Sequence, residues 1–349
     1  MSSPTSHQPP ATVADRSETE LIARIQERLP SPPPWVLVGI GDDAAVVEPE
    51  RSRAEVLSVD ALIEGVHFDR AFVPPDAIGH RALAVNLSDL AAMGAAPRLA
   101  LLSMALPLAL GLDDFDAIIG GFTALAARHR LHVVGGNLTR SPGPLMIDVT
   151  VMGTVKRRQA LTRAGARAGD ALYLSGTLGA AGAGLQMLRA ATSHQPPATS
   201  AAAACVDRYL RPEPRVKLGL LLGRNRAASA CMDLSDGLAD AAYHMAEASG
   251  VGMTIDADAL PIDPGAKAWN ESRHADAMTE ALTAGDDYEL LVAVRPRARR
   301  RATALAERAG VPLTCIGTCT EDRAVLLRRA SAGAPVDAAL TRQAYAHFR

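Results

Sequence analysis

Two adjacent carboxylates stand against an apolar run in the segment GIGDDAAVV, residues 39–47. An isolated buried carboxylate costs several kcal/mol unless something offsets its charge. Asp42 and Asp43 therefore either occupy a surface turn, because Gly-Asp pairs mark turns, or help to bind a cation. The other acidic segments of the chain decide between these two interpretations.

Further carboxylates follow expected strands or lie in loops, in the segments SVDALI, CMDLSDG and GDDYELL. Each has a structural alternative: Asp236 before a glycine could cap a helix, and Asp60 could be an exposed strand end. Several carboxylates at strand and loop ends of an α/β protein nevertheless indicate a hard-cation site. Mg²⁺ prefers oxygen ligands and commonly bridges carboxylates to substrate phosphates.

Asp89 is the carboxylate that a purely structural role explains least well. The segment NLSD puts Asn86, Ser88 and Asp89 in the middle of an expected helix, although all three are weak helix formers. They interrupt an apolar run, and local rules tend to be broken at functional sites. A solvated helix face is the alternative. His67 is the only histidine close to these segments, which favours Mg²⁺ over zinc or a non-haem iron triad.

Known phosphate-binding loops are missing from the sequence. None of the lysines, Lys156, Lys217 and Lys267, stands in a GxxxxGK[ST] motif, and the kinase HRD and DFG motifs are absent. ATP would therefore have to be held by metal-bridged carboxylates, arginines and glycine-rich turns. VVGGN and LSGTLGAAGAG are candidate turns, whose backbone N–H groups could cradle phosphates or simply reverse the chain.

Composition excludes several classes of function. The formal net charge of −2 and the 3% of aromatic residues argue against nucleic acid as a partner. Four scattered cysteines predict reduced thiols, and Cys315 and Cys319 have no second pair to complete a zinc site. The first 17 residues have no apolar core of a signal peptide, and residues 99–112 are too short to span a membrane. We expect a cytoplasmic protein with no membrane partner.

The elements that must position these residues alternate along the chain, which predicts an α/β fold. Apolar and β-branched runs predict strands at 55–63, 131–136, 145–155, 170–176, 229–235 and 289–294. Residues 99–112 predict a buried strand that runs into a turn. Helical periodicity predicts helices at 76–94, 113–130 and 236–250, with Asp76 as the N-cap of the first and Gly94 as its stop.

The pattern restarts after residue 155, which predicts two domains, 18–155 and 156–349, joined by a polar segment. Residues 1–17 are polar and proline-containing and predict a disordered tail. The octamer TSHQPPAT occurs at 5–12 and again at 192–199, which predicts a mobile insertion near 190–203 and not a structural repeat.

Seven segments resemble, in order, those of the thiamine-monophosphate kinase family. They are GIGDDAAVV, SVDALIEGVHF, RALAVNLSDLAAMGAAP, VVGGN, ALTRAGARAGD, MDLSDGLADA and GDDYELL. This family belongs to the ATP-binding superfamily of aminoimidazole ribonucleotide synthetase and selenophosphate synthetase, and the resemblance covers residues 18–349. It implies an α/β fold of α+β type with two α/β domains. The N-terminal domain would have a mixed sheet that forms a barrel-like dimer interface, and the C-terminal domain would be an α/β sandwich.

The resemblance also implies an activity and a site. The activity is Mg²⁺-dependent transfer of the ATP γ-phosphate to thiamine monophosphate by a homodimer that binds several Mg²⁺ ions. The implied metal ligands are Asp43, Ser58, Asp60, Asp89, Asn137, Asp233 and Asp236. The implied ATP contacts are Gly136, Asn137, Arg163 and Ser235, and the implied substrate contacts are His67, Asp286 and Tyr345. Because the acceptor is already a phosphate oxygen, no general base is assigned. Asp42 is then interpreted as a turn residue or as a residue that supports a metal ligand without binding the metal itself.

Two positions depart from the family pattern. Asn137 stands where the family has a metal-binding aspartate, and Asp286 stands where it has a glutamate. Three alternatives remain open at this point: a related kinase with another acceptor, a nucleotide-binding pseudoenzyme that Asn137 would favour, and an α/β protein whose acidic turns are merely solvated.

Overall fold

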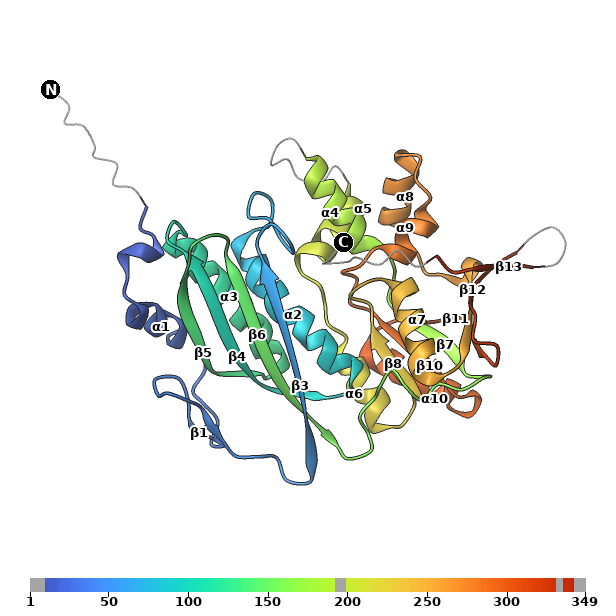
Figure 1. Cartoon of the computed structure of the whole chain (residues 1–349), viewed down its shortest axis with the longest axis horizontal. Coiled ribbons are helices and arrows are strands. Elements are labelled where there is room, and N and C mark those ends of the chain that lie inside the picture. Colours follow the sequence, from blue (N-terminus) through green and yellow to red (C-terminus); the bar gives the residue numbers. More distant parts are fainter. Residues whose placement is uncertain (1–9, 192–198, 331–334, 342–349) are drawn as a thin grey trace. The chain divides into compact units, whose positions relative to one another are not determined.

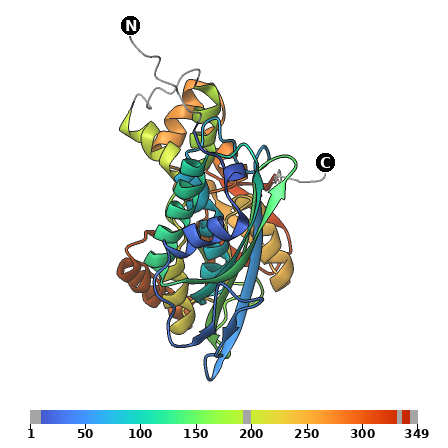
Figure 2. The ribbon, with the colours of Figure 1, turned by 90° about the vertical axis from the view of Figure 1, so that its left-hand side faces the viewer.

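The computed structural model describes residues 10–191, 199–330 and 335–341. The chain divides into two compact units (Figures 1 and 2). The first unit comprises the chain up to residue 49 together with 59–83 and 99–150, and the second comprises 50–58, 84–98 and the chain from 151 onward. Several elements continue from one unit into the other. Among the described residues, no helix is both long and apolar enough to cross a membrane.

A four-stranded sheet, counted over the described residues, has the order β3-β6-β4-β5. Its strands are β3 (Arg53–Ile63), β4 (Ala96–Pro107), β5 (His132–Ser141) and β6 (Met146–Lys156). β4 and β5 are parallel and are connected through helix α3 (Leu112–His129), a β-α-β crossover. Alternate residues of β6, such as Ile147 and Val149, are buried, as expected for a sheet with one face on a core.

Helix α2 (Pro75–Ala92) packs very closely on α3 at its N-terminal end. A Cβ atom at Gly79 would lie 1.8 Å from the Ile118 carbonyl oxygen, and one at Gly121 would lie 1.9 Å from the Asp76 carbonyl oxygen. Only glycine leaves room for this approach of the two backbones.

The start of the chain is more ordered than the sequence predicts. Residues 1–9 lie outside the described part, but 11–17 do not form the expected disordered tail. Val13 is buried, its N–H donates to the Leu110 carbonyl at 2.9 Å, and η1 (Val13–Asp15) precedes helix α1 (Glu18–Gln26). Ser17 and Glu20 form a capping box that begins α1. A short hairpin of β1 (Val36–Val38) and β2 (Val46–Val47) follows.

The second unit has a seven-stranded sheet among its described residues, in the order β13-β12-β9-β11-β7-β10-β8. Neighbouring strands are antiparallel except β12 and β9. The strands are β7 (Ala171–Ser175), β8 (Ala230–Asp233), β9 (Gly252–Asp256), β10 (Leu290–Val294), β11 (Leu313–Thr320), β12 (Val325–Arg329) and β13 (Val336–Ala339). β7 and β10 are buried along their whole length, which explains their unbroken apolar sequences.

Helices cover this sheet and extend beyond it (Figure 1). They are α4 (Ala180–Ala190), α5 (Ser200–Leu210), α6 (Val216–Arg224), α7 (Leu238–Ser249), α8 (Pro264–Ser272), α9 (Ala277–Thr283) and α10 (Arg299–Ala309). The main core of the unit lies between α7 and the sheet and contains Met245, Ile255 and Leu291. A smaller cluster joins α4, α5 and α8 around Cys205.

Most expected elements occur at the expected places, although the expected cap of α2 does not. Asp76 is not the N-cap of α2, because the helix already begins at Pro75, where proline is favoured at a first helical position. Gly94 does end the helix region, with φ of +64°. Of the insertion expected near 190–203, residues 192–198 lie outside the described residues, whereas α4 ends at Ala190 and α5 begins at Ser200.

Candidate functional site

Two carboxylates approach each other in the second unit. Asp89 comes from the last turns of α2, and Asp233 is the last residue of β8. Ser58 of β3 donates its hydroxyl hydrogen bond to Asp89 Oδ2, and Ser88 donates to Asp233 Oδ2 at 2.8 Å. Three elements distant in sequence thus meet at one pair of acids. The polar residues that interrupt the apolar sequence of α2 are the ones that face this pair.

The electrostatics of the pair fit a cation site. Burial raises the pKa of Asp89, while the Ser58 hydroxyl and the positive charge of Arg163 oppose that rise. Burial also raises the pKa of Asp233, and the charge of Asp89 adds to the effect. Asp233 is only 4% exposed. Two carboxylates close together in a poorly solvated place repel each other, so a proton or a metal cation bound between them is favoured.

The donors of the pair suit Mg²⁺, although the pair does not complete a site. Carboxylate and hydroxyl oxygens are hard ligands, and Mg²⁺ is often held by one or two carboxylates together with substrate phosphates. Within the described ranges, no group of three or more histidine, cysteine or acidic side chains is arranged to hold a metal ion. The remaining ligands would therefore include oxygens from outside this pair.

Two loops next to Asp233 are locked together by backbone hydrogen bonds. The Asp286 N–H donates to the Ser235 carbonyl at 2.8 Å, and the Tyr288 N–H donates to the Leu234 carbonyl at 3.1 Å. Asp286 and Tyr288 both have left-handed backbone, with φ of +68° and +49°, and the Tyr288 hydroxyl donates to Asp286 Oδ1 at 3.1 Å. The DLSDG and GDDYEL segments therefore form one structure that presents Ser235 beside Asp286.

A buried ionic network supports these loops, and the sequence did not reveal it. Glu289 is fully buried and accepts hydrogen bonds from Arg208 Nη2 at 2.6 Å, Arg215 Nε at 2.7 Å and Ser175 Oγ at 2.5 Å. Arg208 also donates to the Asp287 carbonyl at 2.8 Å. The sequence did contain one indication of this network: Glu289 is an acidic residue at the start of the apolar run ELLVAV, and a buried charge needs partners.

Asp287 is a second residue that sequence reasoning left without a role. Its carboxylate accepts the backbone N–H groups of Gly179 at 2.7 Å and Ala181 at 3.2 Å, at the start of α4. Complete burial raises the pKa of Asp287 to about 7, against the opposing effect of these donors. Asp287 thus ties the glycine-rich turn LSGTLGAAGAG to the GDDYEL loop, a structural use of that turn.

The first unit carries the acidic residues of the hairpin and of β3. Asp43 is exposed, and its N–H donates to Asp42 Oδ1 at 2.8 Å, so Asp42 shapes the turn. Asp60 is half-buried on β3. His67 follows β3, where its Nδ1 accepts the Ile63 N–H at 3.0 Å.

Gly136 and Asn137 lie on β5 opposite β4. A Cβ atom at Gly136 would lie 1.8 Å from the Leu102 carbonyl oxygen, so only glycine fits there. Asn137 is exposed and pairs in register with Ser103. The glycine thus has a packing reason of its own, and the asparagine amide is accessible.

The expected site residues divide between the units. The second unit brings together Ser58, Asp89, Asp233 and Arg163, and holds Ser235 and Asp286 in the adjoining loops, with Asp236 exposed beside them. The first unit carries Asp43, Asp60, His67, Gly136 and Asn137. Tyr345 lies outside the described residues. Their roles as ligands and contacts remain predictions.

Comparison with known proteins identifies the family of both halves. The model of the AIR synthase related protein, N-terminal domain, matches residues 41–155, and that of the C-terminal domain matches 167–328. Thiamine-monophosphate kinase of Salmonella typhimurium (strain LT2) is 39% identical over 311 residues, 87% of this chain and 91% of the relative. The Bacillus subtilis thiamine-monophosphate kinase is 36% identical over 260 residues, 72% of this chain and 76% of the relative.

Solved structures agree with the sequence comparison. Thiamine-monophosphate kinase from Stenotrophomonas maltophilia K279a superimposes with a TM-score of 0.81 at 40% identity, covering 89% of this chain and 96% of that one. AaThiL complexed with AMPPCP and TMP superimposes with a TM-score of 0.70 at 33% identity, covering 92% and 96%. With both domain models matched in order and these relatives covering most of its length, the chain belongs to the thiamine-monophosphate kinase family of AIR synthase related proteins.

Proposed function

We propose that this chain transfers the γ-phosphate of ATP to thiamine monophosphate, giving thiamine diphosphate and ADP. Family membership makes the chain an enzyme of the kinase class. The Asp89–Asp233 pair, with Ser58, Ser88 and Arg163 around it, is the observation in this molecule that supports phosphate chemistry. The relative complexed with AMPPCP and TMP supports the choice of both substrates.

Mg²⁺ would bind at the Asp89–Asp233 pair, since the donors are hard oxygens and their mutual repulsion favours a cation. A bound Mg²⁺ neutralises charge that develops on transferred phosphoryl oxygens. Ser58 and Ser88 orient the two carboxylates through their hydroxyl hydrogen bonds. Arg163, exposed and near both acids, would contact a phosphate oxygen of ATP.

The reaction needs positioning more than proton transfer. In direct in-line transfer, a phosphate oxygen of thiamine monophosphate forms the new P–O bond as the bond between the γ-phosphorus and its bridging oxygen breaks, and ADP leaves. The attacking oxygen carries no proton that a base must remove, so the chain needs no general base. The locked loops around Ser235 and Asp286 would hold substrate groups at fixed positions.

Turnover is the direct test of this proposal. Purified protein is incubated with ATP and thiamine monophosphate, with MgCl₂ or with EDTA, and thiamine diphosphate is measured by chromatography. Thiamine diphosphate formed only with Mg²⁺ supports the proposal. ATP consumption with a different acceptor from the superfamily would assign a related kinase, and ATP binding without any turnover would assign a pseudoenzyme.

The same proposal includes a homodimer in the cytoplasm. Leu57 and Val59 are 66% and 58% exposed on β3, which is an edge strand of the four-stranded sheet among the described residues. An exposed apolar edge strand is an aggregation hazard unless another chain covers it. Light scattering should give twice the chain mass, and the double variant Leu57→Lys/Val59→Lys should give the monomer mass. A fully active monomeric wild-type protein would contradict the dimer.

A further inference from the structure

A cavity of about 660 Å³ lies in the second unit, and its lining includes none of the residues assigned to the candidate site. The loop 158–162, the segment after α6, and the segment around η3 (Pro296–Ala298) and α10 line it. Its volume is in the range of small-ligand pockets. Thr162 contributes to the cavity wall, whereas the next residue, Arg163, acts on Asp89 and Asp233. The cavity therefore lies next to the candidate site without sharing its assigned residues.

The cavity wall is strongly cationic. Five arginines and no acidic residue line it, and the arginines are Arg158, Arg226, Arg295, Arg297 and Arg301. Among the described residues, none of the five forms an ion pair. The one hydrogen bond found from their guanidinium groups in this part of the chain runs from Arg301 Nη2 to the Arg226 carbonyl at 3.1 Å. Asp170 lies behind the wall, buried, and accepts the Ser229 hydroxyl at 2.6 Å.

Three details show that the protein does not gain stability from this arrangement. Arg295 Nε is buried and has no hydrogen-bond partner among the described residues, which costs free energy that an anion would recover. Helix α10 begins at this wall with Arg299, Arg300 and Arg301 and no acid in its first turn, although the helix dipole disfavours cations there. Arg158 has left-handed backbone, with φ of +63°, where a side chain is strained. Each of these three unfavourable features places a positive charge or a guanidinium N–H donor at the cavity, where an anion could bind it.

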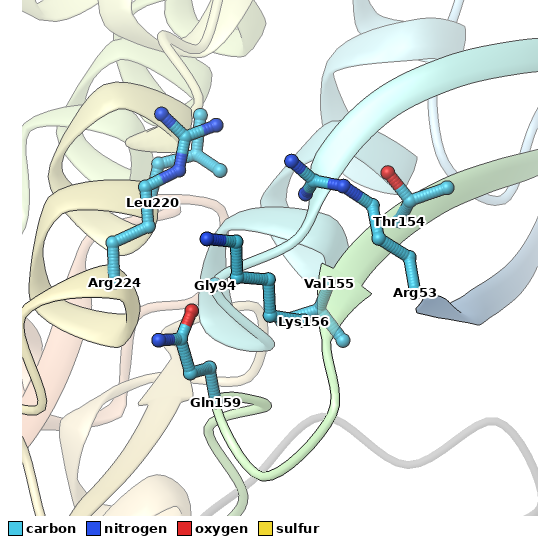
Figure 3. A pocket seen from close by; sticks show the side chains of 8 residues that line it. All are labelled: Arg53, Gly94, Thr154, Val155, Lys156, Gln159, Leu220 and Arg224. Atoms are coloured by element: carbon cyan, nitrogen blue, oxygen red, sulfur yellow. The ribbon is translucent and has the colours of Figure 1, made fainter. Parts of the chain in front are cut away.

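A smaller cavity provides a contrast (Figure 3). It measures about 260 Å³ and shares Gln159 with the larger one. Arg53 and Arg224 reach into it from opposite sides, with Lys156 between them (Figure 3). Here the charge is partly neutralised, because Glu50 pairs with Arg53 and accepts the Thr154 hydroxyl at 2.6 Å. The smaller cavity thus contains a carboxylate partner for one of its arginines, whereas no arginine of the larger cavity has such a partner among the described residues.

We propose that the larger cavity binds a small polyphosphate anion, recognised through its di- or triphosphate group. Guanidinium groups bind phosphate oxygens in a bidentate manner, and five of them can surround several phosphates. Aromatic side chains are absent from the lining, so the cavity offers no stacking platform for a base. Recognition therefore rests on the phosphates, and the site is separate from the one at which ATP reacts.

Calorimetric titration with inorganic tripolyphosphate tests the proposal. EDTA is present so that the carboxylate site cannot recruit the probe through a metal. The test variant is Arg158→Gln/Arg297→Gln, two exposed arginines that no intramolecular bond among the described residues requires. The matched control is Lys156→Gln/Arg224→Gln, which removes the same charge from the smaller cavity. Circular dichroism and thermal melting establish that both double variants fold.

The proposal predicts saturable 1:1 binding to the wild-type protein. Each lost charge-assisted contact should weaken binding about tenfold, so the test variant should bind about 100-fold more weakly. The control should stay within about threefold of wild type, and the KM for ATP should be unchanged in the test variant. Absent saturable binding, equal weakening of both variants, or a raised KM for ATP would each overturn the proposal. Tighter, steeply salt-dependent binding of single-stranded RNA than of tripolyphosphate would overturn it in favour of a nucleic-acid surface.

Discussion

The Ser88 hydroxyl donates to the Asp233 carboxylate at 2.8 Å and so joins the last turns of α2 to the end of β8. Asp89 is the residue after Ser88 on α2. The hydrogen bond between Ser88 and Asp233 therefore also holds Asp89 close to Asp233. A serine inside an apolar helix costs helix propensity, and here its hydroxyl donates to a buried acid and so helps to orient it. Ser88 therefore lowers the stability of the helix locally but fixes the position of Asp233 relative to Asp89.

The first prediction concerns Asp89. Replacing it with Ala removes one charge from the carboxylate pair and should lower kcat about 100-fold or more, as for loss of a major electrostatic stabiliser. The metal-free variant should be as stable as wild type or more stable, because repulsion of Asp233 is relieved. Steady-state kinetics and urea unfolding in EDTA measure the two effects. Asp207→Ala, an exposed acid on α5, is the control. Near-normal turnover of Asp89→Ala would remove Asp89 from the site.

The second prediction concerns Glu289. Glu289→Gln leaves the guanidinium groups of Arg208 and Arg215 without their counter-charge in a buried place, 20% and 16% exposed. Breaking a buried pair in this way should cost about 3–5 kcal/mol of unfolding free energy. Urea denaturation measures the loss. Asp337→Gln, which breaks the exposed Arg328–Asp337 pair, should cost at most about 1 kcal/mol. Equal small losses in both variants would show that Glu289 does not hold the network together.

Local patterns were enough to predict part of the elements of this fold. The alternation in SVDALI and the apolar run ELLVAV correctly predict β3 and β10, and Gly94 correctly predicts the end of the α2 region. The polar residues within α2 also pointed to Asp89 for a physical reason, since their cost in helix propensity had to have a cause. The features that the sequence predicts correctly are therefore those that residues close together in the chain determine.

Features that depend on distant segments were not predictable. The order β13-β12-β9-β11-β7-β10-β8 follows from long-range pairing, and one sequence carries no signal for it. The partners of Glu289 lie more than 70 positions away in the chain, so its charge is visible in the sequence while its neutralisation is not. The prediction that Val13 lies in a disordered tail was wrong for the same reason. Its hydrogen-bond partner, Leu110, lies far along the chain.

The third prediction concerns the pH dependence of stability. Asp287 has its pKa raised by burial to about 7, against an ordinary value of 3.8. Between about pH 4 and pH 7 the folded protein keeps a proton that the unfolded chain has released, so raising the pH through this window lowers the unfolding free energy. The loss approaches about 4 kcal/mol and ends above pH 7, where both states are ionised. Urea unfolding from pH 4.5 to 8 measures it.

Asp287→Asn cannot ionise and should flatten this pH dependence. The variant will be less stable overall, because the Asn amide meets two backbone N–H donors, those of Gly179 and Ala181, with one acceptor oxygen. The measured quantity is therefore the difference between the two pH profiles, which should shrink as the pH rises from 4.5 to 7. Parallel profiles would show that Asp287 is already ionised throughout this range in the folded protein.

The fourth prediction concerns Asn137, which is exposed on β5 and stands where the resemblance to the family implies a metal-binding aspartate. A neutral amide offers an oxygen to a cation but no charge, so Mg²⁺ near Asn137 should bind weakly. Asn137→Asp restores the charge and should lower the Mg²⁺ concentration at half-saturation, since ligand charge tunes affinity for hard cations. The change is nearly isosteric and the side chain is exposed, so stability should be little affected.

Titration of Mg²⁺ at fixed ATP and thiamine monophosphate, for wild type and Asn137→Asp, measures this effect. The maximal rate is not the deciding quantity, because a tighter metal can also slow release of Mg-ADP, and release often limits kcat. Thr139→Asp is the matched control: it adds the same charge at another exposed position of β5, two residues along the strand. A lower half-saturation point in Asn137→Asp alone places a cation at residue 137. An unchanged point, or an equal shift in the control, would show that the metal site does not include this residue.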